Sequence, residues 1–291
     1  MDGIIIINKE KEYTSNDVVQ IVKHTLNEKV GHTGTLDPNA TGVLPILVGK
    51  GTKISKYLVN HDKIYETKLQ LGIKTDTADG EGKVIESEII NKDILSEENI
   101  NKALKAFIGK QTQIPPMYSA IKVNGKKLYD YARKGEQIEI SARNIEIYNI
   151  ELKNIDLKNN QVDIKVECSK GTYIRTLCED IAKKLGTIGY MKELNRIQVG
   201  EFNIKKSIKI QELKNNKNDI KFLKEKIISI EKVLENKEKV TINEKQLEIF
   251  LNGVKINYNH KDGIYRIYDE KEEFIGTGVI QNNKLKRDVI L

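Results

Sequence analysis

Apolar residues follow strand and helix periods in turn along the first part of the chain. The apolar run Ile4 to Ile7 predicts a buried strand. Val18, Val22 and Leu26 then fall on one helical stripe, and Ser15 stands where the cap of that helix is expected. The chain is therefore expected to begin with a buried strand followed by an amphipathic helix.

Alternation with a period of two marks further strands. Between Lys63 and Leu71, Tyr65, Thr67, Leu69 and Leu71 share one face, and Glu66, Lys68 and Gln70 share the other. Tyr65 is thus expected to point with the apolar face. Val162, Ile164, Val166 and Cys168 alternate in the same way and predict a second buried strand.

Helices and turns separate these strands. Ser96 to Ile108 has apolar residues at helical spacing, glutamates in its first turn and Gly109 just past its end, which predicts an amphipathic helix. The Asn124-Gly125 pair predicts a tight hairpin within Tyr118 to Lys127. After Gly171 and Thr172, a helix is expected to carry Ile174, Leu177, Ile181 and Leu185.

The order of these elements indicates the fold class. Strands and helices mix without the regular strand-helix alternation of a parallel doubly wound fold. We therefore expect an α+β fold, with a catalytic domain built around a mixed or mainly antiparallel sheet with flanking helices.

A loop rich in glycine and threonine lies between the first helix and the strand at Lys63. Gly31 to Pro45 reads GHTGTLDPNATGVLP, and glycine and proline disfavour both helix and strand, so the stretch is expected to be irregular. Its single carboxylate, Asp37, is a candidate nucleophile held rigid by Pro38 and Gly42. The alternative is an ordinary Asp-Pro turn in which the aspartate caps its own backbone.

Five segments of the chain carry a family resemblance. Lys29 to Lys53 closely resembles the catalytic signature of the TruB-type tRNA pseudouridine synthases, in which the aspartate of GHTGxLDP is the attacking residue. Further blocks that resemble the family follow in order at residues 65–82, 115–135, 171–178 and 193–202. The resemblance implies that the protein isomerises uridine 55 of the tRNA T arm to pseudouridine.

That reaction breaks the bond from ribose C1′ to uracil N1, turns the base while it stays bound, and joins uracil C5 to the same carbon. The site must therefore hold the freed uracil and exclude water, unlike a two-carboxylate glycosidase that admits water. No redox step is involved, and no cofactor is expected. An aspartate with an ordinary pKa of about 3.9 is ionised at neutral pH without a neighbouring base. The residues leave open whether Asp37 attacks the sugar at C1′, attacks the base at C6, or assists elimination.

The resemblance assigns further residues to the substrate site. Arg175 is implied as the partner of Asp37, because a guanidinium can hold a carboxylate with two hydrogen bonds. Tyr65 and Tyr173 are implied as walls of the uracil pocket, the first by stacking on the base. Leu194 matches a position that contacts the base, although its pattern alone predicts a core residue.

Two residues near the loop complete the candidate site. His32 is implied to shape the substrate by filling the space that the target nucleotide leaves when it flips out of the RNA loop. Lys9 is a weaker candidate for contact with phosphate, because the family carries a lysine there in a Lys-Pro pair. Glu10 replaces that proline, and Glu12 stands in the usual glycine neighbourhood, so the exit of the first strand is expected to differ.

The end of the chain differs in composition from the rest. Residues 214–239 are charged and rich in asparagine, and we place a domain boundary near Leu234 within them. The domains are then expected at 1–234, catalytic, and 235–291, small and β-rich. The second resembles the PUA-type RNA-binding domain of bacterial members, and the alternative is a simple β extension.

Composition narrows the class of protein further. The 291 residues carry a net charge of +7 with a pI of about 9.0, which suits a polyanionic partner without identifying one. Cys168 and Cys178 are expected to be reduced core residues, and the four histidines show no metal-ligand spacing with them. The first apolar run is too short to span a membrane and lacks the features of a signal peptide, so a cytoplasmic protein without a membrane partner is expected.

Three function classes fit the sequence to different degrees. The leading hypothesis is an enzyme that acts alone and without guide RNA on the T arm stem-loop of tRNA, as a monomer. The alternative is an RNA-binding or RNA-folding module with secondary or lost catalysis, which the basic charge also fits. A hydrolase with an aspartate nucleophile fits the loop too, but it would release free uracil.

Overall fold

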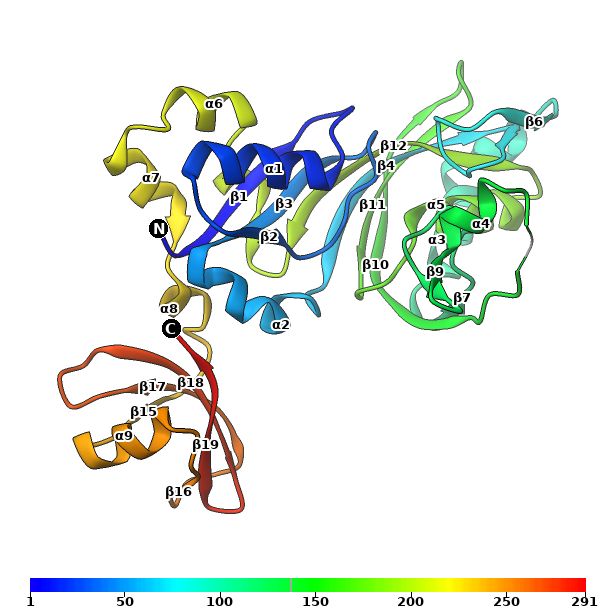
Figure 1. The fold of residues 1–291 in the computed structure, drawn as a ribbon. Coiled ribbons are helices and arrows are strands. Elements are labelled where there is room, and N and C mark those ends of the chain that lie inside the picture. The colour runs from blue at the N-terminus through cyan, green and yellow to red at the C-terminus, as the bar shows by residue number, and fades with distance from the viewer. Residues whose placement is uncertain (137) are drawn as a thin grey trace.

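The computed structural model describes residues 1–136 and 138–291, which form two larger sheets with flanking helices (Figure 1). In these residues the first sheet has ten strands, with the order β14-β1-β3-β12-β4-β11-β10-β7, and with β2 beside β3 and β13 beside β12. Its strands are Gly3–Lys9 (β1), Val30–His32 (β2), Thr41–Val48 (β3), Lys63–Leu71 (β4), Gly109–Gln113 (β7), Arg143–Asp156 (β10), Gln161–Cys168 (β11), Gly189–Val199 (β12), Phe202–Asn203 (β13) and Ile227–Ile228 (β14).

The first sheet is mixed, and β12 joins its two halves. β12 pairs in parallel with β3 at Asn195 and Arg196 and in antiparallel with β4 along nearly its whole length. The neighbouring pairs elsewhere in this sheet are antiparallel. The predicted α+β class with a mixed, mainly antiparallel sheet is confirmed.

Helices cover both faces of this sheet. The α-helices are Ser15–Leu26 (α1), Ser55–Leu58 (α2), Glu97–Lys105 (α3), Leu128–Ala132 (α4), Ile174–Lys184 (α5), Ile210–Asn215 (α6), Ile220–Lys226 (α7) and Ile230–Val233 (α8), and the 3₁₀ helices are Gly49–Ile54 (η1), Lys92–Leu95 (η2) and Ile204–Lys206 (η3). Around β1 and β3, α1, α6 and α7 pack on one face, while η1, α2 and α8 pack on the other. α3 and α5 pack on the half formed by β4, β10 and β11.

The cap of α1 differs from the prediction. Thr14 is the N-cap, its hydroxyl accepts from the amide of Asp17, and the Asp17 carboxylate accepts from the amide of Thr14 in return. Ser15 is the first helical residue, and its buried hydroxyl instead hydrogen-bonds the backbone of Leu36. The predicted helix is therefore correct, and its cap lies one residue earlier.

The expectation that Gly31 to Pro45 is irregular throughout is wrong at both ends. β2 includes His32, and β3 begins at Thr41, so only the middle of the stretch is loop. Pro45 pairs with Ile6 of β1, and on its other side β3 is registered with β12 only at residues 41–42 and with β2 only at residues 46–48. Proline is tolerated there because a strand loses no ladder bond where one side lacks a partner.

Two β-hairpins and a five-stranded sheet lie outside the first sheet. β5 (Ile73–Thr75) pairs with β6 (Val84–Ser87), and β8 (Lys122–Val123) pairs with β9 (Lys126–Lys127) around the predicted Asn124-Gly125 turn. The five-stranded C-terminal sheet has the order β15-β17-β18-β19-β16, and a helix packs in its own core. Its elements are Lys239–Thr241 (β15), Glu244–Leu251 (α9), Ile256–Asn257 (β16), Gly263–Tyr268 (β17), Phe274–Gln281 (β18) and Lys284–Ile290 (β19).

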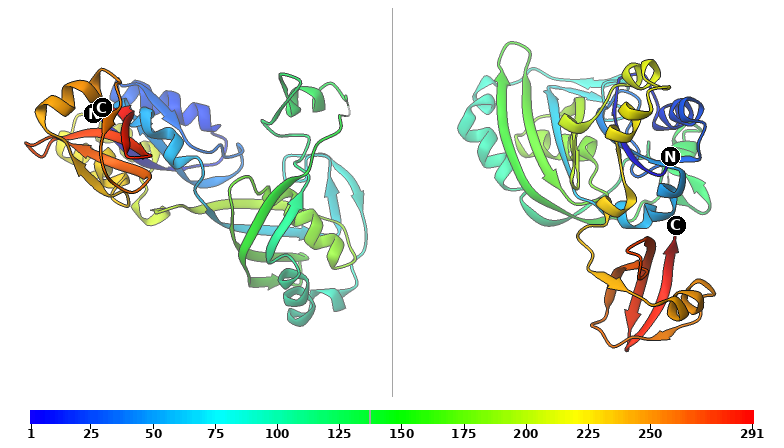
Figure 2. Two further views of the ribbon diagram at one scale, coloured as in Figure 1. Left: turned by 90° about the horizontal axis from the view of Figure 1, so that it is seen from below. Right: turned by 90° about the vertical axis from the view of Figure 1, so that its left-hand side faces the viewer.

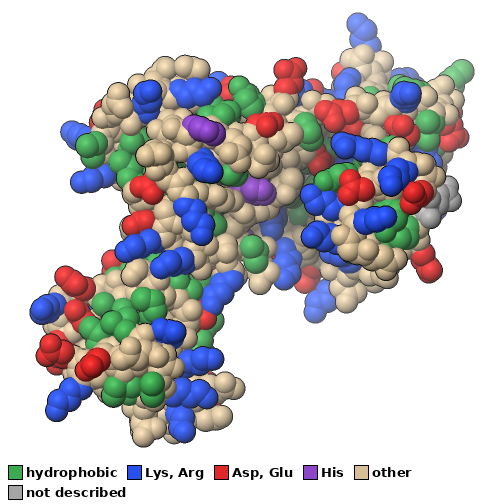
Figure 3. Space-filling view, viewed as in Figure 1, with side chains coloured by type: hydrophobic (Ala, Val, Ile, Leu, Met, Phe, Trp, Pro, Cys, Tyr) green, Lys and Arg blue, Asp and Glu red, His purple; other side chains and the backbone are tan. Residues whose placement is uncertain are grey.

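The charged segment 214–239 is part of the body and not a bare linker. It contains α7 and α8, and its strand β14 pairs with β1. The C-terminal sheet lies below α2 and α8 in Figure 1, projects from the body in the second view of Figure 2, and belongs to the lower left lobe of the space-filling view in Figure 3. Val289 and Leu291 belong to the same hydrophobic cluster as Ile54 and Leu58 at this junction.

Both cysteines are buried and free, as predicted. Among the described residues, none of the helices has the length and apolar character needed to span a bilayer.

Candidate active site

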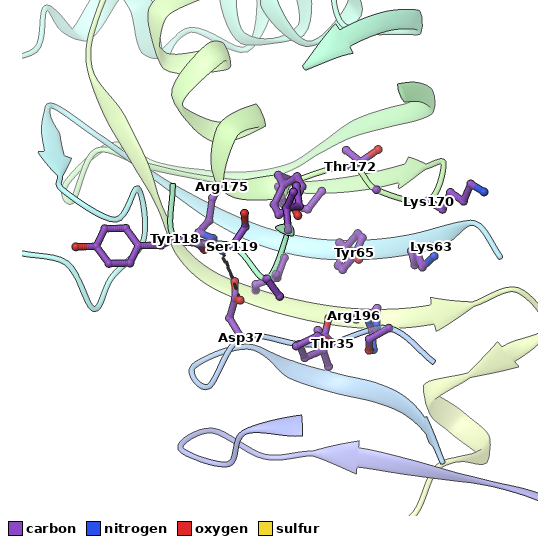
Figure 4. Close-up of a pocket in the computed structure, with 18 of the residues that line it drawn as sticks. Thr35, Asp37, Lys63, Tyr65, Tyr118, Ser119, Lys170, Thr172, Arg175 and Arg196 are labelled. Carbon is purple, nitrogen blue, oxygen red and sulfur yellow. Dashed lines mark hydrogen bonds and ion pairs between the residues drawn. The ribbon is translucent and has the colours of Figure 1, made fainter. Parts of the chain in front are cut away.

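A cavity of about 740 Å³ opens where β4 and β12 meet the loop that precedes β3 (Figure 4). Most of its lining comes from five parts of the chain, namely residues 34–37, the start of β4, residues 118–121, residues 170–175 and the middle of β12, and Val59, Tyr129 and the start of β10 complete it. Asp37, Tyr65, Tyr173, Arg175 and Leu194 all line it. Residues far apart in the sequence are thus brought to one site.

The backbone around Asp37 is held from both sides. The hydroxyl of Ser15 accepts from the amide of Leu36 at 2.8 Å and donates to its carbonyl at 3.1 Å. The ammonium of Lys9 donates to the carbonyl of Pro38 at 2.8 Å, and the amide of Ala40 donates to the carbonyl of Asp37. The carboxylate therefore projects from a fixed loop, as the composition of the loop predicts.

Arg175 holds the Asp37 carboxylate. Its Nε lies 3.1 Å from Oδ2 of Asp37, and its Nη2 donates to the carbonyl of Tyr118 at 2.8 Å. Its Nη1 lies 3.6 Å from Oδ2 of Asp79. The guanidinium is buried, whereas Asp37 leaves 40% of its side chain exposed toward the cavity. Arg175 thus connects three segments and directs the carboxylate toward the space where a ligand fits.

Two opposing effects act on the ionisation of Asp37. The protein atoms around the cavity raise the pKa of its carboxyl above the usual value by desolvation, and the Arg175 guanidinium opposes that rise. The negative charge of Asp79 adds to the rise. Because the ion pair favours the charged form, the geometry suits a carboxylate that acts ionised.

The two tyrosines are fixed by different elements. Tyr65 lies on β4 with its side chain buried against the core, and burial raises the pKa of its phenol. Tyr173 precedes α5, and its backbone amide and carbonyl both bond the side-chain amide of Gln113, at 2.8 Å and 3.0 Å. Leu194 lies on β12 at the cavity wall. Aromatic faces at these positions can enclose a flat base.

Lys9 does not lie where a phosphate contact would require it. Its side chain is fully buried, and its ammonium donates to the carbonyls of Glu10, Tyr13 and Pro38. The structure therefore gives Lys9 a different position from the predicted one, beneath the Asp37 loop. The departure at the exit of β1 is visible at Glu12, whose φ of 71° is a conformation that glycine adopts more readily.

His32 lies on β2 and does not line the cavity. It is half-buried, and its Nδ1 has no hydrogen-bond partner among the described residues. Burial lowers the pKa of its imidazole, and the positive charge of Arg196 lowers it further. His32 therefore lies outside the cavity that Asp37 lines.

Three residues at the site were not singled out from the sequence. Arg196 is 1% exposed and donates to the carbonyls of Val43, Gly34 and Thr35, so it ties β12 to the Asp37 loop. Asp79 and Ser119 also face this region, and the buried hydroxyl of Ser119 has no partner among the described residues. All three fall inside the blocks that resemble the family, and a charged residue on an otherwise buried strand was the available signal for Arg196.

The described residues offer no ligand set for a metal ion. Within residues 1–136 and 138–291, no group of three or more histidine, cysteine, aspartate or glutamate side chains has the arrangement of a metal site.

Sequence comparison places the whole chain in one family. Residues 22–174 match the TruB family pseudouridylate synthase N-terminal domain, residues 175–235 match the tRNA pseudouridylate synthase B C-terminal domain, and residues 239–287 match the C-terminal domain of pseudouridine synthase II TruB. Proteins named tRNA pseudouridine synthase B are 44% identical in Clostridium acetobutylicum, over 98% of both chains, and 42% identical in Francisella tularensis subsp. tularensis, over 98% of this chain and 93% of that protein.

Solved structures share the fold. A Cbf5-Nop10-Gar1 complex contains a chain with a TM-score of 0.71 and 26% identity, over 99% of this chain and 83% of that chain. An H/ACA RNP bound to a substrate RNA containing 2'-deoxyuridine gives a TM-score of 0.72 at 24% identity, over 99% of this chain and 84% of that chain.

The fold and the family matches are those of an RNA pseudouridine synthase, an isomerase. The chain belongs to the TruB family of these enzymes.

Proposed function

We propose that this enzyme converts uridine 55 in the T arm of tRNA to pseudouridine and that Asp37 is the attacking carboxylate. The observation that carries the proposal is the Asp37–Arg175 ion pair at the wall of a cavity that Tyr65 and Tyr173 also line. Curated relatives at 42–46% identity are named for pseudouridine synthesis in tRNA, which supports tRNA as the substrate.

The residues of the cavity divide the work of the reaction. The Asp37 carboxylate assists the opening of the N-glycosidic bond, whose electron pair leaves with uracil N1, and Arg175 keeps that carboxylate ionised and aimed. The new bond from C5 to C1′ forms as the carboxylate is released, and C5 then gives up its proton while N1 takes one up. Tyr65 packs against one face of the uracil, while Tyr173 and Leu194 close the remaining sides. The cavity walls hold the freed base while it turns and bonds through C5. Exclusion of bulk water protects the reacting sugar carbon from hydrolysis during that time.

Substrate access requires the target uridine to leave its RNA loop. A nucleotide flipped out of a stack reaches a cavity that a paired or stacked base cannot enter, at a cost of a few kcal/mol. We propose that His32, which lies on β2 and outside the lining of the cavity, helps to shape the emptied RNA loop as the family resemblance implies.

The proposal also covers the domain boundaries, the oligomeric state and the cellular location of the enzyme. Residues 1–234 are proposed as the catalytic domain and residues 235–291 as a PUA-like RNA-binding domain, supported by the separate core of the C-terminal sheet. The enzyme is proposed to act as a monomer, without guide RNA, in the cytoplasm where tRNA is found. The junction packing of Val289 and Leu291 on the body supports a fixed placement of the smaller domain.

The test is Asp37→Asn, which keeps the shape of the side chain and removes its charge. We expect the variant to bind unmodified tRNA within about threefold of the wild type and to form no pseudouridine at position 55, measured by mapping of modified sites. The exposed Asp93→Asn variant is the matched control and keeps full activity. Normal product from Asp37→Asn contradicts the role of the carboxylate, product at another uridine contradicts the site in tRNA, and release of free uracil indicates a hydrolase.

A further inference from the structure

The cavity has two electrostatically different ends. Figure 4 shows Asp37 and Arg175 toward one end and Lys63 and Lys170 toward the other, with Tyr65 between them. At the first end the Asp37 carboxylate pairs with the Arg175 guanidinium, which also pairs with Asp79 outside the lining. The second end holds cations.

The cations at the second end lack carboxylate partners. The ammonium of Lys63 donates to the carbonyl of His61, and that of Lys170 donates to the side-chain oxygen of Asn60. Arg196, which lines the cavity near them, donates to three backbone carbonyls. None of the ion pairs formed by the described residues involves these three side chains. The carboxylate of Asp62, next in sequence to Lys63, accepts instead from the hydroxyl of Tyr148.

Cations buried without a carboxylate partner cost stability. Lys63 is only 8% exposed, and desolvation together with the field of Arg196 lowers the pKa of its ammonium to about 8. Buried charges in proteins are normally paired, or they bind an ion. A ligand that brings a negative charge to this end would relieve the repulsion between Lys63 and Arg196.

The substrate class decides which anion that is. In an RNA the phosphodiester groups carry the negative charge, whereas uracil and ribose are neutral near pH 7. The rim of the cavity at this end is open, since Lys170 and Arg143 are exposed and a Cβ on Gly171 would meet no atom within 4 Å. A sugar-phosphate backbone can therefore approach the end without displacing side chains.

We propose that Lys63 and Lys170, supported by Arg196, form a subsite for one backbone phosphate next to the target uridine. The inference rests on the proposed RNA substrate but not on which uridine is modified. Tyr65 lies between this subsite and Asp37, so a phosphate held at the cationic end fixes how far the nucleotide reaches into the cavity. The subsite thus positions the glycosidic bond against the carboxylate.

The test measures binding of unmodified tRNA by Lys63→Met and Lys170→Met, each in the Asp37→Asn background so that no turnover intervenes. Each substitution is expected to raise Kd about tenfold and to reduce the slope of log Kd against log salt concentration by about one. The exposed Lys217→Met variant, between α6 and α7, is the matched control and leaves both quantities unchanged.

A phosphate scan separates this subsite from general basic charge. Single neutral methylphosphonates are placed on either side of the modified uridine in a ligated tRNA. One position is expected to weaken binding by the Asp37→Asn protein but to add nothing when Lys63→Met is also present. Equal effects at every position in both proteins would overturn the proposal. If Lys63→Met fails to fold, the same scan on the exposed Lys170→Met decides the matter. Pseudouridine at an unexpected uridine would overturn only the assignment of position 55, because the scan follows the nucleotide that is modified.

Discussion

Replacing Lys9 with methionine tests how the loop that carries Asp37 is held. The change keeps the length of the side chain and removes the ammonium, which donates to Glu10 at 3.0 Å, Tyr13 at 2.6 Å and Pro38 at 2.8 Å. Hydrogen bonds from a charged donor contribute about 1.5–3 kcal/mol each, so three contribute about 5–9 kcal/mol. Burial lowers the pKa of Lys9 from 10.5 to about 8, which corresponds to a cost of about 3 kcal/mol.

The difference leaves a net stabilisation of at least about 2 kcal/mol, and we take about 3 kcal/mol as the expected loss in Lys9→Met. For a chain of this size the loss lowers Tm by about 5–10 °C. Thermal unfolding followed by circular dichroism measures it, and Lys11→Met is the control, because its ammonium is exposed and forms only a 3.9 Å surface ion pair with Glu193. Equal Tm values for the two variants would refute the view that Lys9 fixes the loop.

The same variant has a signed dependence on pH. Between about pH 8 and 10.5 the unfolded chain keeps the Lys9 proton while the folded chain releases it, so wild-type stability gains from rising pH in that window. Lys9→Met lacks this gain. The difference in unfolding free energy between the two proteins should therefore widen above pH 8. A difference that stays constant up to pH 10.5 would show that the carbonyls hold the pKa of Lys9 near its ordinary value.

Three more changes test the site. Arg175→Lys keeps the charge but loses the forked contact with Asp37, so the single-turnover rate should fall about 100-fold with little change in Kd, and a rate within twofold of the wild type contradicts this role. Asp79→Asn removes a charge that raises the pKa of Asp37, so the acidic limb of the rate-pH profile should move to lower pH, and a move to higher pH would show that Asp79 acts otherwise. Gly42→Ala places a Cβ 2.2 Å from the carbonyl of Arg196 at a φ of 106°, so it should destabilise the fold by more than about 3 kcal/mol in chemical denaturation, and a loss below 1 kcal/mol would mean that β3 and β12 can separate there.

Elements with a strong period were predictable from the sequence. β1, β4, β11, α3 and α5 all appear where apolar spacing placed them, because each buries one face against a large core. The exact ends of the elements were harder to predict. Ser15 and Thr14 are equally good N-caps by residue type, and Thr14 caps α1 because the hydroxyl of Ser15 bonds the Leu36 backbone instead.

The local sequence pattern could not predict several features in and around the site. Pro45 disfavours a strand on its own, but the register of β3 gives it a position where no amide is needed. Lys9 was recognised as a notable position but not as a buried one, since burial of an ammonium depends on three carbonyls brought there by the fold. The pairing of Arg175 with Asp37 was expected from family resemblance, whereas the contact of Arg175 with Asp79 comes from the hairpin after β5.

The place of β12 in the first sheet affects how the polypeptide matures during translation. β1, β3 and β4 leave the ribosome early, yet β3 and β4 have no common neighbour until residues 189–199 emerge. For most of synthesis the nascent polypeptide thus exposes two unpaired strand edges, which are prone to pair with other polypeptides. Chaperone demand should consequently fall sharply once the ribosome has passed this segment, and the catalytic cavity is complete only from that moment.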